Sequence, residues 1–150
     1  MFDITIRLAN RFDSEQILLL CQEHSAYEKA DYDSKDKLGL ITKNFFDSEH
    51  NVKCIVAEQT DTLVGYATFM KQFSSWDADF YVYLDCLYLK ESIRGKGIGI
   101  LMMNYVRNYA TNENCKIIQW QTPDFNKNAI KFYRKIGGIS KTKERFFWKI

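Results

Sequence analysis

The stretch from Leu87 to Leu101 limits the possible folds of this chain more than any other, because it predicts a strand, a glycine-rich loop and a helix in direct succession. The loop reads Arg94-Gly95-Lys96-Gly97-Ile98-Gly99. Glycines let a backbone approach another group closely, and the N–H groups in the first turn of the following helix have no partner within that helix. Such a loop is suited to hold an anion, although an ordinary strand-to-helix turn with solvated basic residues also explains three alternating glycines.

The basic residues of this loop favour the anion-binding interpretation. Arg94 and Lys96 lie at the positive end of the expected helix dipole, where cations are disfavoured unless an anion is bound nearby. Charge is divided in the same sense along the chain: residues 1–91 hold 16 acidic and 9 basic side chains, whereas residues 92–150 hold 3 and 12. One half is therefore suited to a cationic ligand and the other to a polyanion, with chance clustering of surface charge as the alternative.

Length and composition limit the classes of protein to which the chain can belong. Its 150 residues, 46% of them hydrophobic, predict one packed domain spanning residues 1–150. No apolar run approaches the ~20 residues of a membrane span, and the first residues lack a signal-peptide pattern, so a cytoplasmic location without a membrane partner is expected. The four cysteines are scattered without a C-x-x-C pair, which argues against a disulfide framework and a zinc site.

The two histidines, His24 and His50, belong to no cluster with the spacing of metal ligands. No metal cofactor is therefore expected. His24 falls in the first expected helix, close to its end, and is interpreted as a solvated histidine or one at the edge of the core.

The hydrophobic pattern predicts ten elements in the order β-α-α-β-β-β-α-β-α-β. Strands are expected at residues 3–9, 53–58, 63–73, 80–89, 116–121 and 139–150. Helices are expected at about residues 13–28, 38–46, 98–114 and 126–136. Since no repeat or linker appears, this order describes a mixed α/β sandwich with helices on both faces of one sheet.

A second motif lies in the last expected helix, where residues 126–137 read N-K-N-A-I-K-F-Y-R-K-I-G. Together with the R-x-x-G-x-G pattern at Arg94, Gly97 and Gly99, and with the order of elements, it resembles the GNAT superfamily of acetyl-CoA-dependent N-acetyltransferases over essentially the whole chain. A dinucleotide-binding or P-loop motif does not fit, because neither G-x-G-x-x-G nor G-K-[ST] occurs. The resemblance implies a GNAT-type α/β fold with a mixed, mostly antiparallel central sheet.

The resemblance also implies acetyl-CoA as the co-substrate and assigns residues to it. In the family, loop amides bind the CoA pyrophosphate, and the preceding strand splays from its neighbour and pairs with the pantetheine arm through backbone groups. The asparagine of the second motif contacts the same arm, and its lysine approaches the phosphates. The corresponding residues here are Arg94, Gly95, Lys96, Gly97, Ile98 and Gly99 for the pyrophosphate, Leu87 and Leu89 for the arm, and then Asn126 and Lys135.

Acetyl transfer to an amine requires two proton transfers. An amine attacks a thioester only when deprotonated, and an amine with a pKa near ~10 is mostly charged at neutral pH, so a side chain or a water path has to accept its proton. The thiolate that leaves then needs a proton. By the resemblance Tyr133 is the general acid and Asp85 helps to receive the amine proton, while the strand amide at Leu87 meets the developing oxyanion. A packed aromatic side chain is the alternative for Tyr133.

Within the superfamily the sequence is similar to the diamine and polyamine (spermidine/spermine) N-acetyltransferases and the related thialysine acetyltransferases. The features are Tyr27-Glu28 at the end of the first helix, Val56-Ala57-Glu58, and the strand Tyr83-Leu84-Asp85-Cys86-Leu87 that runs into the loop. This likeness implies that the amine is bound by Tyr27, Glu28, Trp76 and Asp85, with a core or surface aromatic as the alternative for Trp76. The sequence departs from the polyamine enzymes at Cys86, because they usually carry two adjacent acids at this place.

The leading expectation is transfer of an acetyl group from acetyl-CoA to a primary amine of a small cationic substrate: a polyamine, a diamine or a lysine-like compound. An aminoglycoside or other antibiotic acetyltransferase and a non-catalytic acyl-CoA-binding module are the alternatives. No nucleic-acid partner is expected, because the basic C-terminal half lacks a binding motif. Family members often form homodimers, sometimes by exchanging their last strand, and the aromatic end Phe146-Phe147-Trp148 would suit a buried strand.

Overall fold

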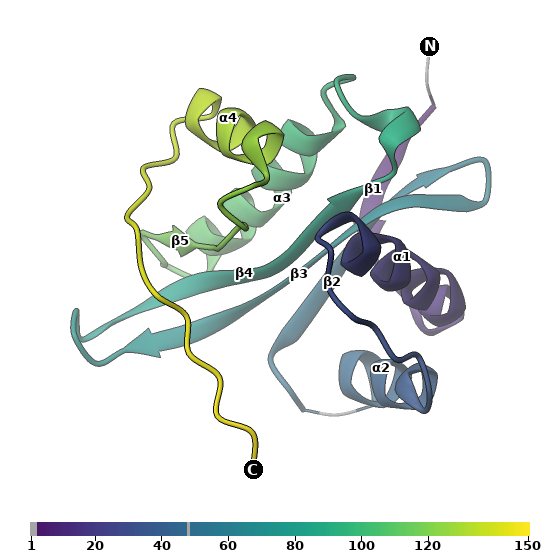
Figure 1. Ribbon diagram of the computed structural model, residues 1–150, viewed down its shortest axis with the longest axis horizontal. Helices are drawn as coiled ribbons and strands as arrows, with labels where there is room; N and C mark the ends of the chain where they lie inside the picture. Colours follow the sequence, from purple (N-terminus) through teal and green to yellow (C-terminus); the bar gives the residue numbers. More distant parts are fainter. Residues whose placement is uncertain (1–2, 48) are drawn as a thin grey trace.

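The computed structural model describes residues 3–47 and 49–150 (Figure 1). Its elements in chain order are β1 (Thr5–Leu8), the 3-10 turn η1 (Arg11–Asp13), α1 (Ser14–Tyr27), α2 (Lys37–Phe46), β2 (Val52–Gln59), β3 (Thr62–Ser74), β4 (Asp79–Leu89), the 3-10 turn η2 (Glu91–Ile93), α3 (Ile98–Asn112), β5 (Ile118–Gln119) and α4 (Lys127–Lys135). Within these ranges no helix combines the length and the apolar character needed to cross a membrane.

The strands form one sheet in the order β1-β2-β3-β4-β5. The first three pairings are antiparallel, and the pairing of β4 with β5 is parallel. The turn between β2 and β3 consists of Thr60 and Asp61, which both have positive φ (47° and 61°), the conformation that two-residue hairpin turns favour. The mixed, mostly antiparallel sheet implied by the sequence is therefore confirmed.

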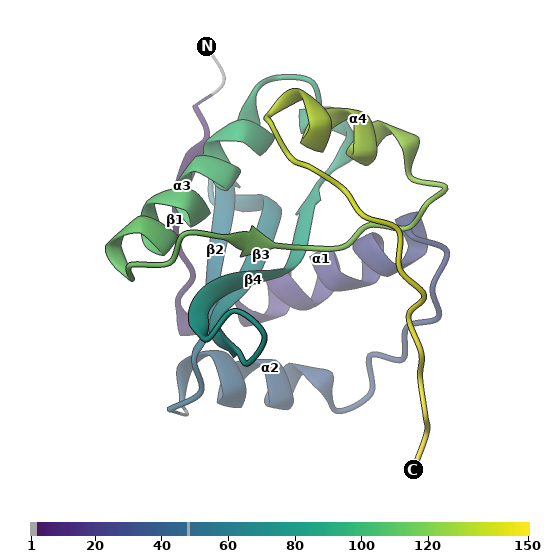
Figure 2. The same cartoon turned by 90° about the vertical axis from the view of Figure 1, so that its left-hand side faces the viewer.

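Helices cover both faces of the sheet, with α1 and α2 on one side and α3 and α4 on the other (Figure 1, Figure 2). Alternate residues of β2 serve the two sides: Ile55 and Ala57 pack in the cluster beneath α3, whereas Cys54 and Val56 pack in the cluster beneath α1. All four are buried. Because both faces are covered, the strands read as nearly continuous apolar runs.

The segment 139–150, which we call the C-terminal arm, differs from its prediction as a strand. It runs past β5 without joining the described sheet (Figure 1) and leaves the side chains of Phe146, Phe147 and Trp148 exposed. β5 is also shorter than the predicted strand at 116–121. Both differences arise because a strand needs a neighbouring edge to pair with, and β5 pairs with β4 through only two residues. The prediction of a last strand at 139–150 is wrong for the single chain.

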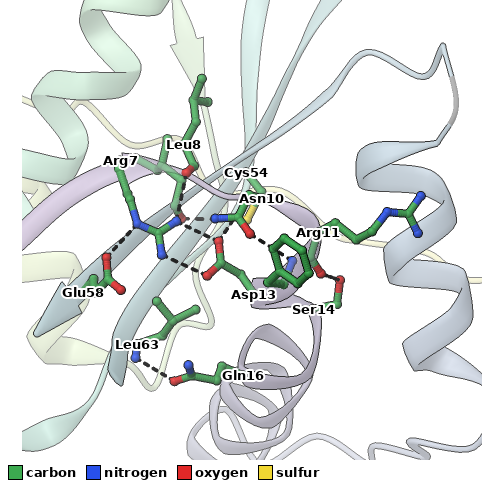
Figure 3. Close-up of polar contacts among 12 residues, drawn as sticks. Arg7, Leu8, Asn10, Arg11, Asp13, Ser14, Gln16, Cys54, Glu58 and Leu63 are labelled. Atoms are coloured by element: carbon green, nitrogen blue, oxygen red, sulfur yellow. Dashed lines mark hydrogen bonds and ion pairs between the residues drawn. The ribbon is translucent and has the colours of Figure 1, made fainter. Parts of the chain in front are cut away.

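An ionic cluster joins β1 to the start of α1 (Figure 3). The buried Asp13 carboxylate accepts two hydrogen bonds from the Arg7 guanidinium, at 2.7 and 2.9 Å, and one from the backbone N–H of Asn10 at 2.7 Å. Arg7 Nε donates to the Glu58 carboxylate of β2 at 2.7 Å. A single guanidinium therefore ties two strands to the beginning of the first helix.

Candidate active site

A cleft opens where β4 and β5 separate. The two strands pair only through Val82 with Ile118 and Tyr83 with Gln119, after which β5 ends and β4 continues to Leu89. The resemblance implied such a splay. Beyond Tyr83, one edge of β4 consequently faces an open space instead of another strand.

A β-bulge at Asp85 decides which backbone groups of β4 face this open edge. Thr68 of β3 pairs with Cys86, and the next residue, Phe69, pairs with Leu84, so Asp85 is the extra residue. A bulge shifts the alternation of a strand by one residue and turns the extra side chain aside. Asp85 is exposed as a result, and it lies on the wall of the cleft.

Beyond the bulge, the backbone groups of Leu87 and Leu89 point into the cleft. Lys90 N–H donates to the carbonyl of Val64 on β3 at 2.9 Å. Because hydrogen-bonded and non-hydrogen-bonded pairs alternate along an antiparallel ladder, the N–H and C=O groups of residues 87 and 89 are directed away from β3. The Leu89 carbonyl accepts a hydrogen bond from Arg94 Nε at 2.8 Å on that side. This orientation suits the predicted pairing with an extended pantetheine arm.

The cleft has a volume of about 1260 Å³ and is walled by the end of α1, the open edge of β4, the glycine loop, α4 and the C-terminal arm. It exceeds the roughly 300–1,000 Å³ of ordinary small-molecule pockets, so a long co-substrate and a small acceptor can share it. The predicted site residues that line it are Tyr27, Glu28, Asp85, Leu87, Leu89, Arg94, Gly95, Gly97, Gly99, Asn126, Tyr133 and Lys135.

Three predicted site residues do not line the cleft. Trp76 lies in the turn between β3 and β4 and is 96% exposed, because this hairpin extends beyond the helices that cover the sheet (Figure 1). Lys96 donates from Nζ to the carbonyl of Ser92 at 2.7 Å, and the side chain of Ile98 is buried in the core beneath α3. The structure thus separates Trp76 from the other residues assigned to the amine. Lys96 and Ile98 can contact a ligand through their backbone amides, because their side chains are engaged elsewhere.

The glycine loop leaves the start of α3 open to a ligand. Gly97, the residue before the helix, has a φ of 83°, a left-handed conformation that favours glycine, and no hydrogen bond from a described side chain caps the helix at this residue. The guanidinium of Arg94 lies over the ring of Tyr27, with Cζ 4.1 Å from the ring centre. Uncapped amides beside a fixed cation are the donors that a diphosphate requires.

The left-handed conformation at Gly97 leads to a testable expectation. Gly97→Ala adds a β-carbon to a backbone conformation that costs an ordinary residue about 1–2 kcal/mol, so the loop will shift and the Kd for acetyl-CoA will rise about tenfold. Isothermal titration calorimetry measures this directly. Gly39→Ala in α2 is the matched control, since a β-carbon there meets nothing within 4 Å, and its Kd will equal that of the natural chain. Equal Kd values for all three proteins would contradict the role of the loop.

Gly99 contributes to the site in a different way. A β-carbon at this position would lie 3.2 Å from Cζ of Phe132, a residue of α4, so glycine permits the close approach of α3 and α4. That approach brings α4 and its Tyr133 beside the glycine loop.

Asn126 connects the two walls of the cleft. Its side-chain oxygen caps α4 by accepting from the Ala129 N–H at 3.2 Å, and it also accepts from the Tyr27 hydroxyl at 3.1 Å. The residue as a whole is 9% exposed. Since the oxygen already has two protein donors, the amide NH₂ is the group through which Asn126 can reach a co-substrate.

Tyr133 has the properties of a proton donor. Its ring packs against Trp120 and Phe132, with ring centres 5.1 and 5.3 Å apart. Burial, followed by the nearby charge of Glu28, raises the pKa of Tyr133 to about 12. The phenol therefore keeps its proton at neutral pH and is available to donate it to the sulfur of a thioester as negative charge develops there.

Cys86 supplies a neutral group where the polyamine enzymes carry a second acid. Its thiol donates to Asp85 Oδ2 at 3.7 Å. Burial and the charge of Asp85 raise the pKa of Cys86 to about 12, so the thiol keeps its proton. The acidic end of the cleft consequently holds the carboxylates of Asp85 and Glu28. Among the described residues, no three His, Cys, Asp or Glu side chains are grouped as metal ligands would be.

The structure also places His24 in the wall of the cleft. The sequence alone had suggested a solvated histidine or one at the edge of the core. Its Nδ1 lies 2.9 Å from the Tyr66 hydroxyl, and its Nε2 lies 3.2 Å from Glu28 Oε1. The ring stacks on Tyr88, with centres 5.2 Å apart. The spacing of four residues between His24 and Glu28, which puts both on one helix face, is the sequence signal that could have found this pair.

Comparison with known proteins agrees with the fold. The family profile described as "Acetyltransferase (GNAT) family" matches residues 15–138. Thialysine N-epsilon-acetyltransferase of Sus scrofa is 28% identical over 145 residues, which cover 91% of this chain and 85% of that protein.

Solved structures agree as well. A transcriptional regulator from Bacillus halodurans C-125 superposes with a TM-score of 0.83 at 20% identity, covering 97% of this chain and 99% of the other. An aminoglycoside N-acetyltransferase in complex with CoA gives a TM-score of 0.80 at 17% identity, covering 97% and 94%. At such identities the likeness concerns the fold, whereas the profile match spans most of the sequence, including the glycine loop and α4. The chain belongs to the GNAT family of acetyltransferases.

Proposed function

We propose that this acyltransferase moves the acetyl group of acetyl-CoA to a primary amine of a small cationic substrate: a polyamine, a diamine or a lysine-like compound. The observation that carries the proposal is the presence of groups of both charges in one cleft. The carboxylates of Glu28 and Asp85 line the same cleft as Arg94 and the glycine loop, whose amides at the start of α3 are uncapped. A cationic acceptor and a polyanionic donor can therefore bind together, each beside groups of opposite charge.

The proposed reaction is a direct attack on the thioester. The ammonium of the acceptor gives one proton to Asp85, directly or through water, and the free amine forms a C–N bond to the acetyl carbon. The backbone N–H of Leu87, at the open edge of β4, stabilises the negative oxygen that develops. The C–S bond then breaks, the thiolate takes the proton of Tyr133, and the second proton of the nitrogen returns the phenol to its neutral form.

The acceptor class rests on the acidic groups and on the named relatives. Thialysine, the acceptor in the name of the Sus scrofa relative, is a lysine-like diamine, and Glu28 and Asp85 offer the charge such a compound needs. The neutral thiol at Cys86 reduces the charge available to a longer polyamine. We therefore place lysine-like compounds and short diamines ahead of spermine among the proposed acceptors.

An acceptor panel tests this function. Purified protein with acetyl-CoA is assayed for CoA release with lysine analogues, diamines, polyamines, aminoglycosides and peptides. Saturable release is expected with the first three groups. Faster turnover of aminoglycosides would favour the antibiotic alternative, and acetyl-CoA binding without release by any amine would favour a non-catalytic binding module.

We further propose that the protein is a homodimer in which the C-terminal arm is buried. Support comes from the exposed Phe146, Phe147 and Trp148, because an exposed apolar run of this kind is costly in a lone chain. Sedimentation of the full chain is expected to give twice the mass of 17.7 kDa, and the double variant F146D/W148D is expected to give the single mass. A full chain that sediments at the single mass would refute this assembly.

A further inference from the structure

His24 is a partly buried titratable group to which the mechanism above assigns no task. It lies on α1, and its side chain is 14% exposed. Both ring nitrogens have partners, since Nδ1 meets the Tyr66 hydroxyl at 2.9 Å and Nε2 meets Glu28 Oε1 at 3.2 Å. Stacking on Tyr88 fixes the plane of the ring. A side chain held at both ends and on one face has a single orientation.

These contacts determine where the proton of the imidazole lies. A carboxylate only accepts hydrogen bonds, so the nitrogen facing Glu28 has to be Nε2–H. The other nitrogen of a neutral ring then accepts, and Tyr66 is the donor. Tyr66 is 2% exposed, and burial raises its pKa well above the ordinary value, so its hydroxyl keeps the proton that this bond needs.

We propose that His24 is a positioning residue: the chain of hydrogen bonds from Tyr66 through His24 to Glu28 holds the Glu28 carboxylate in one orientation at the acceptor end of the cleft. The inference rests on the proposed function, because the group that Glu28 would receive is the cationic acceptor. It adds the internal anchor that lets a carboxylate at the end of a helix present a fixed charge to an amine. Without that anchor, the side chain of Glu28 would sample several rotamers.

The charged state of His24 links this anchor to pH. The groups that face the ring are Glu28 directly after α1, Tyr66 from β3, Tyr88 and Asp85 from β4, and Arg94 from the loop. Burial lowers the pKa of His24 even though Glu28 and Asp85 oppose the shift, so the ring is neutral at pH 7. When it gains a proton, its charge offsets that of Glu28. Recognition of a cationic acceptor is therefore lost as the pH falls through the lowered pKa of His24.

Kinetics and NMR of three variants test the proposal. His24→Leu removes the donor to Glu28, and kcat/KM for the best cationic acceptor will fall about tenfold, through KM of the amine and not through KM of acetyl-CoA. His24→Gln places an amide N–H near the position of Nε2–H, so it will recover most of the lost kcat/KM. In the natural chain kcat/KM falls at acidic pH as His24 gains a proton, and we call this fall the acidic limb of the pH profile. His24→Gln will lack the acidic limb because glutamine does not titrate. His50→Gln changes an exposed histidine before β2 and will match the natural chain.

The tautomer is read without any substrate. Long-range ¹⁵N–¹H spectra of the natural chain will show His24 as the neutral Nε2–H form at pH 7, assigned by its absence from His24→Gln. Tyr66→Phe, which keeps the buried ring and removes only the hydroxyl, will weaken that preference and lower kcat/KM in the same direction. This variant serves if His24→Leu does not fold.

Several results would overturn the proposal. They are an Nδ1–H tautomer, an unchanged acceptor KM in His24→Leu, or the same acidic limb in His24→Gln and the natural chain. Failure of the proposed function looks different, because no amine would then release CoA from the natural chain. The proposal would in that case be judged by the tautomer alone. Glu28→Met removes the accepting oxygens at similar size, so a weakened preference for Nε2–H in this variant supports the proposal and an unchanged preference refutes it.

Discussion

Tyr133→Phe is expected to lower kcat for the best amine acceptor by about 10²- to 10⁴-fold, the usual contribution of a general acid. Phenylalanine keeps the ring that packs against Trp120 and Phe132 and removes only the hydroxyl. The thiolate then has to wait for a proton from water. Because the pKa of Tyr133 is raised to about 12, the hydroxyl is already a donor throughout the neutral range, and the effect of the variant will be nearly constant from about pH 6 to 9.

Tyr133→Phe also distinguishes an effect on acetyl-CoA binding from an effect on the chemical step. The Kd for acetyl-CoA, measured by calorimetry, will change less than about twofold, because the loop amides and Arg94 are untouched. Tyr105→Phe on α3 is the matched control, since its ring packs against the core on the same side of the sheet and lines no part of the cleft. If Tyr133→Phe and Tyr105→Phe have equal kcat, Tyr133 is a packing residue and the acid has to be sought elsewhere.

Asp13→Asn is expected to lower the free energy of unfolding by about 2–3 kcal/mol at pH 7. The change replaces one accepting oxygen with an NH₂ group that faces the donors of Arg7, which stand 2.7 and 2.9 Å from the carboxylate oxygens. Arg7 keeps Glu58 as a partner, which limits the loss. Urea denaturation followed by circular dichroism measures the difference. Asp31→Asn in the exposed link between α1 and α2 makes the same chemical change outside the cluster and is expected to be neutral.

The pH dependence of this difference has a definite sign. Burial would raise the pKa of Asp13, but the hydrogen bonds from Arg7 and from the backbone N–H of Asn10 outweigh it, so the pKa is lowered in the folded chain. As the pH is lowered, the Asp13 carboxylate of the unfolded chain therefore binds a proton at a higher pH than the same carboxylate in the folded chain. The contribution of Asp13 is complete above the unfolded pKa of about 3.9 and is lost as the pH falls below it. The difference in the free energy of unfolding between the natural chain and Asp13→Asn will consequently become smaller in acid. A difference that stays constant down to pH 3 would contradict the ionic cluster as its source.

The local pattern of residue types was sufficient to predict the helices and strands that depend mainly on neighbouring residues in the sequence. Continuous apolar runs identified β2, β3 and β4, helical spacing identified α1 and α3, and the glycines marked the start of α3. The bulge at Asp85 could not be predicted, since it is defined by the register of β4 against β3. His24 was missed for a similar reason, because its partner Tyr66 and its stacking ring Tyr88 lie more than forty residues away.

The remaining differences come from surroundings that a sequence does not display. The C-terminal arm has the residues of a strand, yet a strand forms only where an edge accepts it. Trp76 has the character of a binding residue, yet the hairpin carries it away from the cleft. The roles of Tyr133 and Asp85 in the reaction stay predictions until the variants are measured, although both side chains line one cleft.

The hydrogen bond between Tyr27 and Asn126 has a consequence for biosynthesis. It joins side chains 99 positions apart, so the two walls of the cleft come from an early and a late part of translation. The ribosome covers the most recently added residues, and contacts of such long sequence separation form late. Strands β1 to β4 and α1 can associate before α4 has been synthesised, whereas the contact between Tyr27 and Asn126 forms only after Asn126 has left the ribosome. A nascent chain that lacks α4 therefore lacks one wall of the cleft, and a ligand of the cleft can stabilise the chain fully only after that wall is in place.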